Sequence, residues 1–183
     1  MRDLPKPAEP LTDGDVALRE WTGADVEAMV APLNEPEIAR WTRVPAPYTR
    51  TDAEDFIRRA EERRKSGDEL SLAIVAAPAG DLLGSISVRV ASWDNMRGEL
   101  GYLVFAHARD RGVATRAVRL LTRFALEHIG LRRVEVLAAT GNLASQRVAE
   151  KAGFTREGVL RSYMDVRGTR LDMVAFSLLP GEL

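Results

Sequence analysis

The chain has no cysteine, and only two of its 183 residues are histidine. Without cysteine it can form no disulfide, no thiolate metal site and no acyl-cysteine intermediate. No apolar run approaches the roughly 20 residues of a membrane-spanning helix, and the proline-rich residues 4–7 lack the apolar core of a signal peptide. We therefore expect a cytoplasmic protein and assign it no metal.

The chain also lacks a large excess of charge of either sign. Lys and Arg number 26 against 27 for Asp and Glu, which gives a formal net charge of −1. This balance gives no support to nucleic acid or an anionic membrane as a partner. A chain of 183 residues, 45% of them hydrophobic, is long enough for one domain with a substantial core and short for two. Residues 1–183 are expected to form a single domain.

The spacing of the apolar residues changes along the chain, and the expected secondary structure changes with it. From residue 70 the pattern has period two, with Ile86, Val88 and Val90 on one face of a strand. Thr51 and Glu54 have the spacing of a capping box, which predicts a helix start. The expected strands are 16–19, 70–76, 82–90, 100–104, 134–138, 155–164 and 172–179. The expected helices are 24–30, 35–41, 51–66, 112–125 and 144–152.

A basic segment that contains glycine, residues 109–114, joins the strand at 100–104 to a long amphipathic helix. Glycine at such a junction lets a ligand approach the backbone without a Cβ in the way. The first N–H groups of a helix have no internal partner and carry the positive end of the dipole, so the junction is an anion site. Arg109, Arg111 and Arg116 add full positive charges. The segment is either a phosphate cradle or a solvated basic turn, and its context favours the cradle.

Three segments, in this order, resemble the GNAT acetyltransferase superfamily. The first is 101–104 followed by the R-x-x-G-x-A pattern of 109–114. The second, 142–154, is similar to the N-x-x-S…K-x-G-F run of the subgroup that contains the Rim-type N-terminal acetyltransferases of ribosomal proteins. The third is the Glu-Gly pair at 157–158 with a closing strand. The resemblance implies an α/β (α+β) fold, with a central mixed, mostly antiparallel, splayed sheet of about seven strands flanked by helices.

The resemblance also implies acetyl-CoA as co-substrate. The loop N–H groups would hold its pyrophosphate, and the pantetheine would lie where the two central strands splay. The N–H of Val104 would polarise the thioester carbonyl and stabilise the oxyanion. The positions assigned to cofactor binding are Leu103, Val104, Arg109, Arg111, Gly112, Val113, Ala114, Thr115, Asn142 and Ser145.

An amine that attacks a thioester must lose a proton. Glu99 is the preferred general base, acting through water, because strand alternation places it on one face with Gly101 and Leu103. The alternative is that Glu99 is an ion-paired carboxylate at an edge. Asp165 and Glu157 are second-ranked candidates.

The leaving thiolate needs a proton donor. Many GNAT enzymes have a tyrosine four residues before the glycine that matches Gly153, but here that position is Ala149. Ser145 lies one helical turn earlier on the same face, so it supplies the hydroxyl or holds a water. Alternatively, Ser145 only caps the helix that Asn142 begins. Tyr163 is a more distant candidate.

In this family the segment that corresponds to 32–59 covers one side of the acceptor site. The side chains expected to line that site are Trp41, Tyr48, Trp93, Arg40 and Arg43. The two histidines, His107 and His128, are assigned structural roles. A protein N-terminus, an aminoglycoside, a polyamine and an amino acid all stay open as acceptors.

We therefore predict an N-acetyltransferase that passes an acetyl group directly from acetyl-CoA to a primary amine of a protein N-terminus or a small molecule. A non-catalytic acyl-CoA-binding or regulatory module is the alternative, and the missing tyrosine leaves room for it. A dinucleotide-binding oxidoreductase would need a G-x-G-x-x-G turn after an early strand, which this loop does not match. Rim-like relatives are often dimers, so a homodimer is a further expectation.

Overall fold

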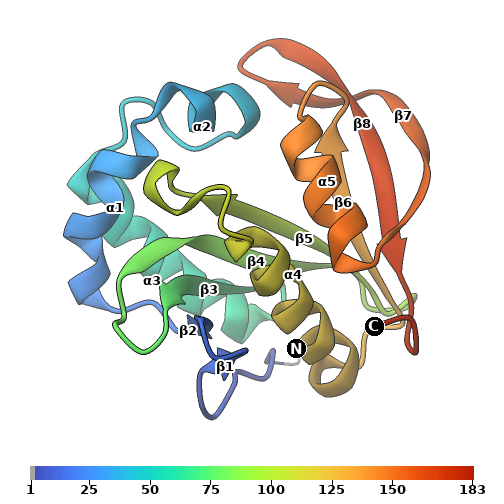
Figure 1. Cartoon of the computed structure of the whole chain (residues 1–183), viewed down its shortest axis with the longest axis horizontal. Coiled ribbons are helices and arrows are strands. Elements are labelled where there is room, and N and C mark those ends of the chain that lie inside the picture. The colour runs from blue at the N-terminus through green and yellow to red at the C-terminus, as the bar shows by residue number, and fades with distance from the viewer. Residues whose placement is uncertain (1–2) are drawn as a thin grey trace.

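Strand pairing builds one continuous eight-stranded sheet in the order β1-β2-β3-β4-β5-β6-β8-β7 (Figure 1). The computed structural model describes residues 3–183. Neighbouring strands are antiparallel apart from β5 and β6, which are parallel because helix α4 crosses between them. The strands are β1 (Leu11–Thr12), β2 (Val16–Arg19), β3 (Glu69–Ala76), β4 (Leu82–Ser92), β5 (Arg97–Val104), β6 (Arg133–Ala139), β7 (Thr155–Val166) and β8 (Thr169–Leu178). The mixed, mostly antiparallel sheet is confirmed, and β1 is one strand more than the pattern predicted.

Helices cover both faces of the sheet, because alternate side chains of each strand point to opposite faces. On β3, Leu70, Leu72 and Ile74 pack in one apolar cluster with α4 and α5. Ala73 and Val75 point the other way, into a second cluster with α1 and α3. The helices are α1 (Val26–Leu33), α2 (Pro36–Trp41), α3 (Arg50–Ser66), α4 (Val113–Phe124) and α5 (Leu143–Ala152).

The two parallel strands separate before they end. Pairing of β5 with β6 runs from Arg97 opposite Arg133 to Leu100 opposite Val136, and no residue pair follows in the described chain. Both strands nevertheless continue, β5 to Val104 and β6 to Ala139. The backbone groups beyond Leu100 therefore face a wedge instead of a neighbouring strand. This is the splay that the resemblance implied.

The N-cap of helix α3 lies two residues earlier than predicted. Its capping box is formed by Thr49 and Asp52, with the Thr49 N–H donating to Asp52 Oδ2 at 2.8 Å. The T-x-x-acid pattern occurs twice in succession, and Thr49 has the extended backbone that an N-cap needs. Thr51 lies inside the helix, and Glu54 accepts from Arg50 Nε at 2.8 Å. The prediction of Thr51 and Glu54 as the capping box was wrong.

Candidate functional site

Two cavities adjoin on the face of the sheet that carries α1 and α3. The wedge cavity, about 300 Å³, lies where β5 and β6 separate. The aromatic cavity, about 510 Å³, lies between α1, α3 and the strands β3 to β5. Both are lined by Arg43, Ser85 and Leu103, so these three residues mark their junction. The wedge cavity lies on the β6 side of these residues, and the aromatic cavity lies on the side of the N-terminal helices.

Glu99 lines the wedge cavity together with Gly101 and Leu103, as strand alternation predicted. Its Oε2 also accepts from Arg89 Nη2 at 2.8 Å across β4 and β5. The Glu99 side chain is 21% exposed, so solvent reaches the carboxylate despite the ion pair. The two interpretations of Glu99 are therefore compatible: its carboxylate is ion-paired, and it also faces the cavity where a general base would be needed.

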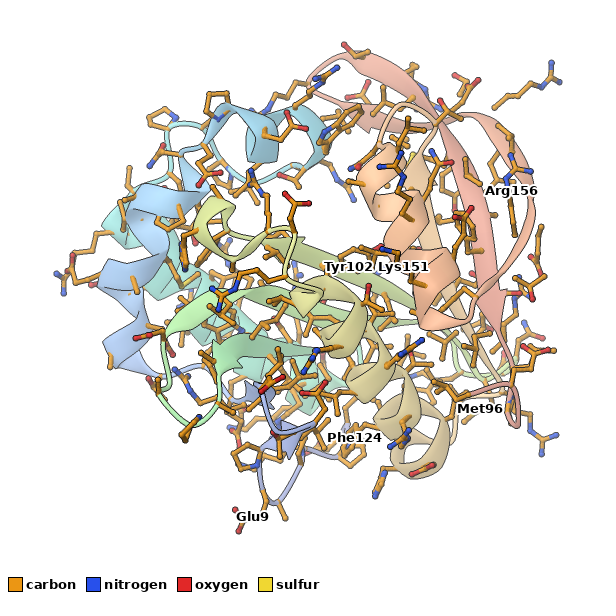
Figure 2. The ribbon with its side chains drawn as sticks, in the orientation of Figure 1. Glu9, Met96, Tyr102, Phe124, Lys151 and Arg156 are labelled. Atoms are coloured by element: carbon orange, nitrogen blue, oxygen red, sulfur yellow. The ribbon has the colours of Figure 1, made fainter. Side chains whose placement is uncertain are left out.

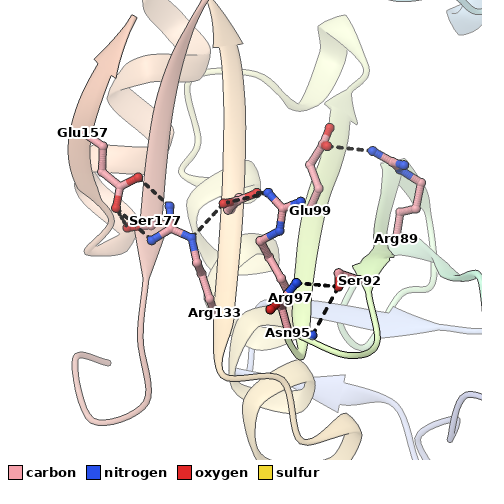
Figure 3. Close-up of polar contacts among 9 residues, drawn as sticks. Arg89, Ser92, Asn95, Arg97, Glu99, Arg133, Glu157 and Ser177 are labelled. Carbon is pink, nitrogen blue, oxygen red and sulfur yellow. Dashed lines mark hydrogen bonds and ion pairs between the residues drawn. The ribbon is translucent and has the colours of Figure 1, made fainter. Parts of the chain in front are cut away.

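A ladder of charged side chains crosses the sheet below the wedge (Figure 3). Arg97 and Arg133 both bond Glu135, and Arg133 continues to Glu157, which also accepts from Ser177 Oγ at 2.7 Å. The hydrogen bond from Arg133 lowers the pKa of Glu157 to about 2. Glu157 lines neither cavity, so its carboxylate binds Arg133 and Ser177 within the ladder and does not face the site.

Asp165 also lies outside both cavities. Its Oδ1 accepts from the N–H of Gly168 at 3.1 Å, within the turn between β7 and β8. The second-ranked general bases are therefore not brought to the site.

The end of β5 presents its backbone to the wedge. Phe105 donates its N–H to the Leu83 carbonyl at 2.9 Å, which places the odd-numbered residues of β5 in the hydrogen-bonded pairs with β4. The N–H groups of Tyr102 and Val104 consequently point toward the β6 side, beyond the last β5–β6 pair. This is the direction from which a thioester carbonyl would approach the Val104 N–H.

Arg109 is held by the protein itself. Its Nε donates to the Val104 carbonyl at 3.0 Å, and its Nη2 lies 2.8 Å from Glu35 Oε2. Glu35 also accepts from the N–H of Ala106 at 3.3 Å. Arg109 thus joins the end of β5 to the N-terminus of α2, and its guanidinium faces these partners instead of the loop amides.

The loop before α4 leaves backbone donors open. Gly112 precedes the helix with φ = 75°, in the left-handed region that favours glycine, and a Cβ built there would meet nothing within 4 Å. The first helical hydrogen bond runs from the Arg116 N–H to the Gly112 carbonyl at 3.1 Å. The N–H groups of Val113, Ala114 and Thr115 therefore precede the helical ladder.

Two other arginines were predicted beside this loop. Arg111 is exposed at the loop, whereas the Nη1 of Arg116 lies 2.6 Å from Asp15 Oδ2 and also bonds Asp13. Of the charges placed here by the sequence, that of Arg111 is the one that the described structure leaves for an anion.

Tyr102 is the functional candidate that sequence analysis missed. It lines the wedge cavity, and its hydroxyl lies 2.9 Å from Ser145 Oγ and donates to the Ser145 carbonyl at 3.0 Å. Figure 2 shows it between β5 and α5. Burial raises the pKa of Tyr102 to about 12, so the phenol is protonated at neutral pH. The sequence did contain a clue to this role. Neighbouring residues of a strand point to opposite faces of the sheet, so if Gly101 faces the acceptor, Tyr102 must face α5.

Ser145 stands behind Tyr102 and does not itself line either cavity. Its N–H donates to Asn142 Oδ1 at 3.0 Å, which is an N-cap bond, and Asn142 also lines the wedge cavity. Ala149, at the position where many relatives have tyrosine, is fully buried. Asn142 and the Tyr102–Ser145 pair are thus the polar groups that α5 helps to place at the wedge.

The three aromatic residues predicted for the acceptor site lie in three different places. Trp41 lines the wedge cavity, and its ring passes so close to Gly141 that a Cβ there would lie 3.1 Å from Trp41 Cη2. Tyr48 lines the aromatic cavity and is 5% exposed. Trp93 does not line either cavity. Its Nε1 donates to the Gly67 carbonyl at 3.1 Å, because the β4–β5 turn lies at the opposite end of β5 from Val104.

Other candidates also lie away from the site. Arg40 stacks over the Trp41 ring, with 4.6 Å between the guanidinium carbon and the ring centroid. His128 stacks on Phe124, and Tyr163 is 51% exposed on β7. His107 lines neither cavity. By contrast, Trp21 and Phe56, which the sequence did not suggest, form one wall of the aromatic cavity with their ring centroids 5.3 Å apart.

Among residues 3–183, no three His, Asp or Glu side chains gather as a metal site would require. No described helix is both long enough and apolar enough to cross a membrane.

Sequence comparison identifies the class of protein. Residues 15–155 match the family model described as the acetyltransferase (GNAT) domain. The chain therefore belongs to the GNAT acetyltransferases, which are acyltransferases with acetyl-CoA as co-substrate, and the dinucleotide-binding alternative is set aside.

Individual relatives agree with this assignment. The chain is 31% identical to the probable N-acetyltransferase YjcK of Bacillus subtilis over 137 residues, which are 72% of this chain and 74% of that protein. It is 38% identical to YdaF of the same organism over 103 residues, and this match spans 56% of each chain, just over half the length of YdaF. The fold is shared with RimJ of Mycobacterium smegmatis in complex with CoA-disulfide, at a TM-score of 0.85 and 22% identity, covering 96% of this chain and 88% of that one.

Proposed function

We propose that residues 1–183 act as one cytoplasmic N-acetyltransferase domain, which transfers an acetyl group from acetyl-CoA directly to a primary amine. The observation that carries the proposal is the separation of β5 from β6 immediately before the open amides of α4. This arrangement offers one end of acetyl-CoA an anion site and the other end an unpaired strand edge. The amine would arrive from the opposite side, through the aromatic cavity.

Acetyl-CoA would be held mainly by backbone. Its pyrophosphate accepts from the N–H groups that begin α4, near Gly112, and Arg111 supplies the nearest full positive charge. Its pantetheine lies in the wedge beside Leu103 and Val104, within reach of Asn142. Arg109 positions this strand end and does not itself bind the phosphates. The solved structure of the self-immunity acetyltransferase MccE, in complex with acetyl-CoA and AMP, has the same fold at a TM-score of 0.81, which supports this placement.

The transfer itself needs a base for the amine, a donor for the oxyanion and a group that stabilises the leaving thiolate. Glu99 accepts the proton of the attacking amine through a water, and the amine nitrogen forms a bond to the acetyl carbon. The Val104 N–H donates to the oxyanion that develops on the carbonyl oxygen. The carbon–sulfur bond then breaks, and the electron pair leaves on the CoA sulfur.

The leaving thiolate would meet the hydroxyl of Tyr102, with Ser145 behind it. A thiol with an ordinary pKa of about 8.5 is a stronger acid than this phenol, whose pKa is about 12. Complete proton transfer from Tyr102 would therefore be unfavourable. To stabilise the thiolate, the phenol turns its single hydrogen from the Ser145 carbonyl to the sulfur, while its oxygen accepts from Ser145 Oγ. The proton that Glu99 removed from the amine goes to solvent or to the thiolate.

The test is an acceptor panel with acetyl-CoA and succinyl-CoA, in which free thiol is measured and each product is weighed by mass spectrometry. Thiol release that depends on the amine, together with one acetyl group added to that amine, is the expected result. Tight acetyl-CoA binding without amine-dependent thiol release would overturn the proposal and favour the non-catalytic acyl-CoA-binding module.

A further inference from the structure

We infer that the acceptor is a small α-amino carboxylate with a large apolar, preferably aromatic, side chain. The inference rests on the proposed function and names the substrate class for the same site. It follows from the walls of the aromatic cavity, the charge at its junction with the wedge cavity, and the position of Glu99 beyond that junction.

The walls of the aromatic cavity favour an apolar body. Trp21, Tyr48, Phe56 and Phe105 line it, and Tyr48 and Phe105 are almost completely buried. Trp21 is fixed by a 3.2 Å hydrogen bond from its Nε1 to Ser71 Oγ. A volume of about 510 Å³ falls within the range of pockets that bind small organic molecules. A fixed aromatic wall of this kind binds a flat apolar group better than it binds a hydrated polar chain.

The charges of the aromatic cavity favour an anion. Arg63 is neutralised by Glu69 at 2.8 Å, and Asp52 is occupied in the capping box of α3. Arg59 donates from Nε to the Asp55 carbonyl at 3.2 Å and forms a long ion pair with the Asp55 carboxylate at 4.0 Å. Arg43 makes no hydrogen bond or ion pair with any of residues 3–183. Its guanidinium is therefore the lining cation without a counter-ion, and a carboxylate is the geometry that it pairs with best.

Arg43 places the anion at the junction of the two cavities. It lines both cavities, whereas Glu99 lines only the wedge. The molecule that fits has both an amine, which enters the wedge toward Glu99, and a carboxylate, which pairs with Arg43. An α-amino carboxylate has both groups at one end, and its side chain then enters the aromatic cavity. A peptide N-terminus has a neutral amide at the same place, and a polyamine would bring positive charge to Arg43.

The roof of the site also favours a small molecule. Arg167, in the turn between β7 and β8, donates from Nε to the Ala39 carbonyl at 3.1 Å and also bonds the Val44 carbonyl. The turn thereby joins α2 and the loop after it, and Figure 1 shows these segments side by side. A polypeptide would have to pass beneath this bridge to bring its N-terminus to the wedge.

The experiment compares matched amines with acetyl-CoA as donor. L-phenylalanine and L-phenylalanine amide differ in the carboxylate, and because the amide is the weaker base, their rates are compared at equal concentrations of unprotonated amine. Alanine tests the apolar body, and spermidine tests the charge. We expect kcat/KM for phenylalanine to exceed that for its amide, for alanine and for spermidine by at least about tenfold. Arg43→Met should bring the ratio between phenylalanine and its amide close to one. Arg156→Met, an exposed arginine on β7 that points away from the molecule in Figure 2, is the matched control and should keep the ratio.

The outcomes separate the inference from the proposed function. If the amide or spermidine is acetylated as well as phenylalanine, the inference is overturned and the acetyltransferase activity stands. If calorimetry shows that phenylalanine binds to the CoA-loaded protein through Arg43, but no amine releases thiol, the inference is supported and the proposed function fails. The absence of both binding and turnover would overturn both.

Discussion

The two sides of the site differ in the groups that form them: one uses mainly backbone, the other mainly side chains. The acetyl-CoA side consists of backbone groups that follow each other closely in the chain, from the end of β5 to the first turn of α4. The acceptor side consists of side chains from α1, α3 and three strands, which the fold brings together over more than 80 residues of sequence. A site made of local backbone depends on few residues, whereas a site made of distant side chains changes with each of them. The acetyl-CoA side is therefore the constant half, and specificity belongs to the acceptor half.

The largest effect is expected on the backbone side, from Gly112→Glu. The added carboxylate would enter the open space that we assign to the pyrophosphate, and like charges in contact cost several kcal/mol. The affinity for acetyl-CoA should fall by about a thousandfold, below detection by calorimetry. Circular dichroism should show that the fold is kept.

Gly80→Glu is the control for this variant. Gly80 has the same left-handed backbone, with φ = 84°, and the same open space around a built Cβ, but it lies in the β3–β4 turn. Both variants should lose about 1 kcal/mol of stability from the strained backbone. Equal losses of acetyl-CoA affinity in the two variants would contradict the phosphate-loop assignment.

The same contrast explains what the sequence could predict. The order of strands and helices and the position of the loop follow from patterns that are local in the chain, such as 101–104 before 109–114, whereas the splay was implied by the family resemblance that those segments carry. Trp93 was misplaced because its sequence neighbours do not say at which end of β5 the turn lies. Trp21 and Phe56 were missed because their meeting depends on how α3 packs across the sheet. Tyr102 was missed because its partner, Ser145, is 43 residues away.

Glu99→Gln tests the junction between the two halves. Loss of the general base should lower kcat by about a hundredfold at neutral pH, with little change in the affinity for acetyl-CoA. Glu135→Gln is the matched control, because Glu135 is opposite Glu99 in the register of β5 and β6 but lines neither cavity. Steady-state rates of both variants, measured across pH, show whether Glu99 acts in proton transfer. A similar loss of kcat in both variants would mean that removal of an ion-paired carboxylate from this part of the sheet, and not loss of proton transfer, accounts for the effect.

A smaller loss is expected for Tyr102→Phe, which removes only the hydroxyl that contacts Ser145 and that we propose to stabilise the leaving thiolate. We expect kcat to fall by about tenfold, the value of one good hydrogen bond in the transition state. Ser145→Ala should cost less than this, because its hydroxyl acts through Tyr102, and less than Glu99→Gln. Tyr163→Phe, on the exposed surface of β7, is the control and should leave kcat unchanged. A larger effect of Ser145→Ala than of Tyr102→Phe would reverse the proposed order of the two hydroxyls.

The smallest effect is expected for Glu157→Gln, which belongs to neither half. The hydrogen bond from Arg133 lowers the pKa of Glu157 to about 2, below the ordinary value of about 4.3. Its stabilising contribution is therefore complete above about pH 4.3 and is lost as the pH falls toward 2. The side chain is 40% exposed, so solvent limits the contribution to less than about 1 kcal/mol. Urea denaturation should show that the variant is slightly less stable than the parent at pH 7 and that the difference disappears by about pH 2. Because Glu157 lies outside both cavities, kcat at pH 7 should stay unchanged, and a lower kcat would return this carboxylate to the list of candidate bases.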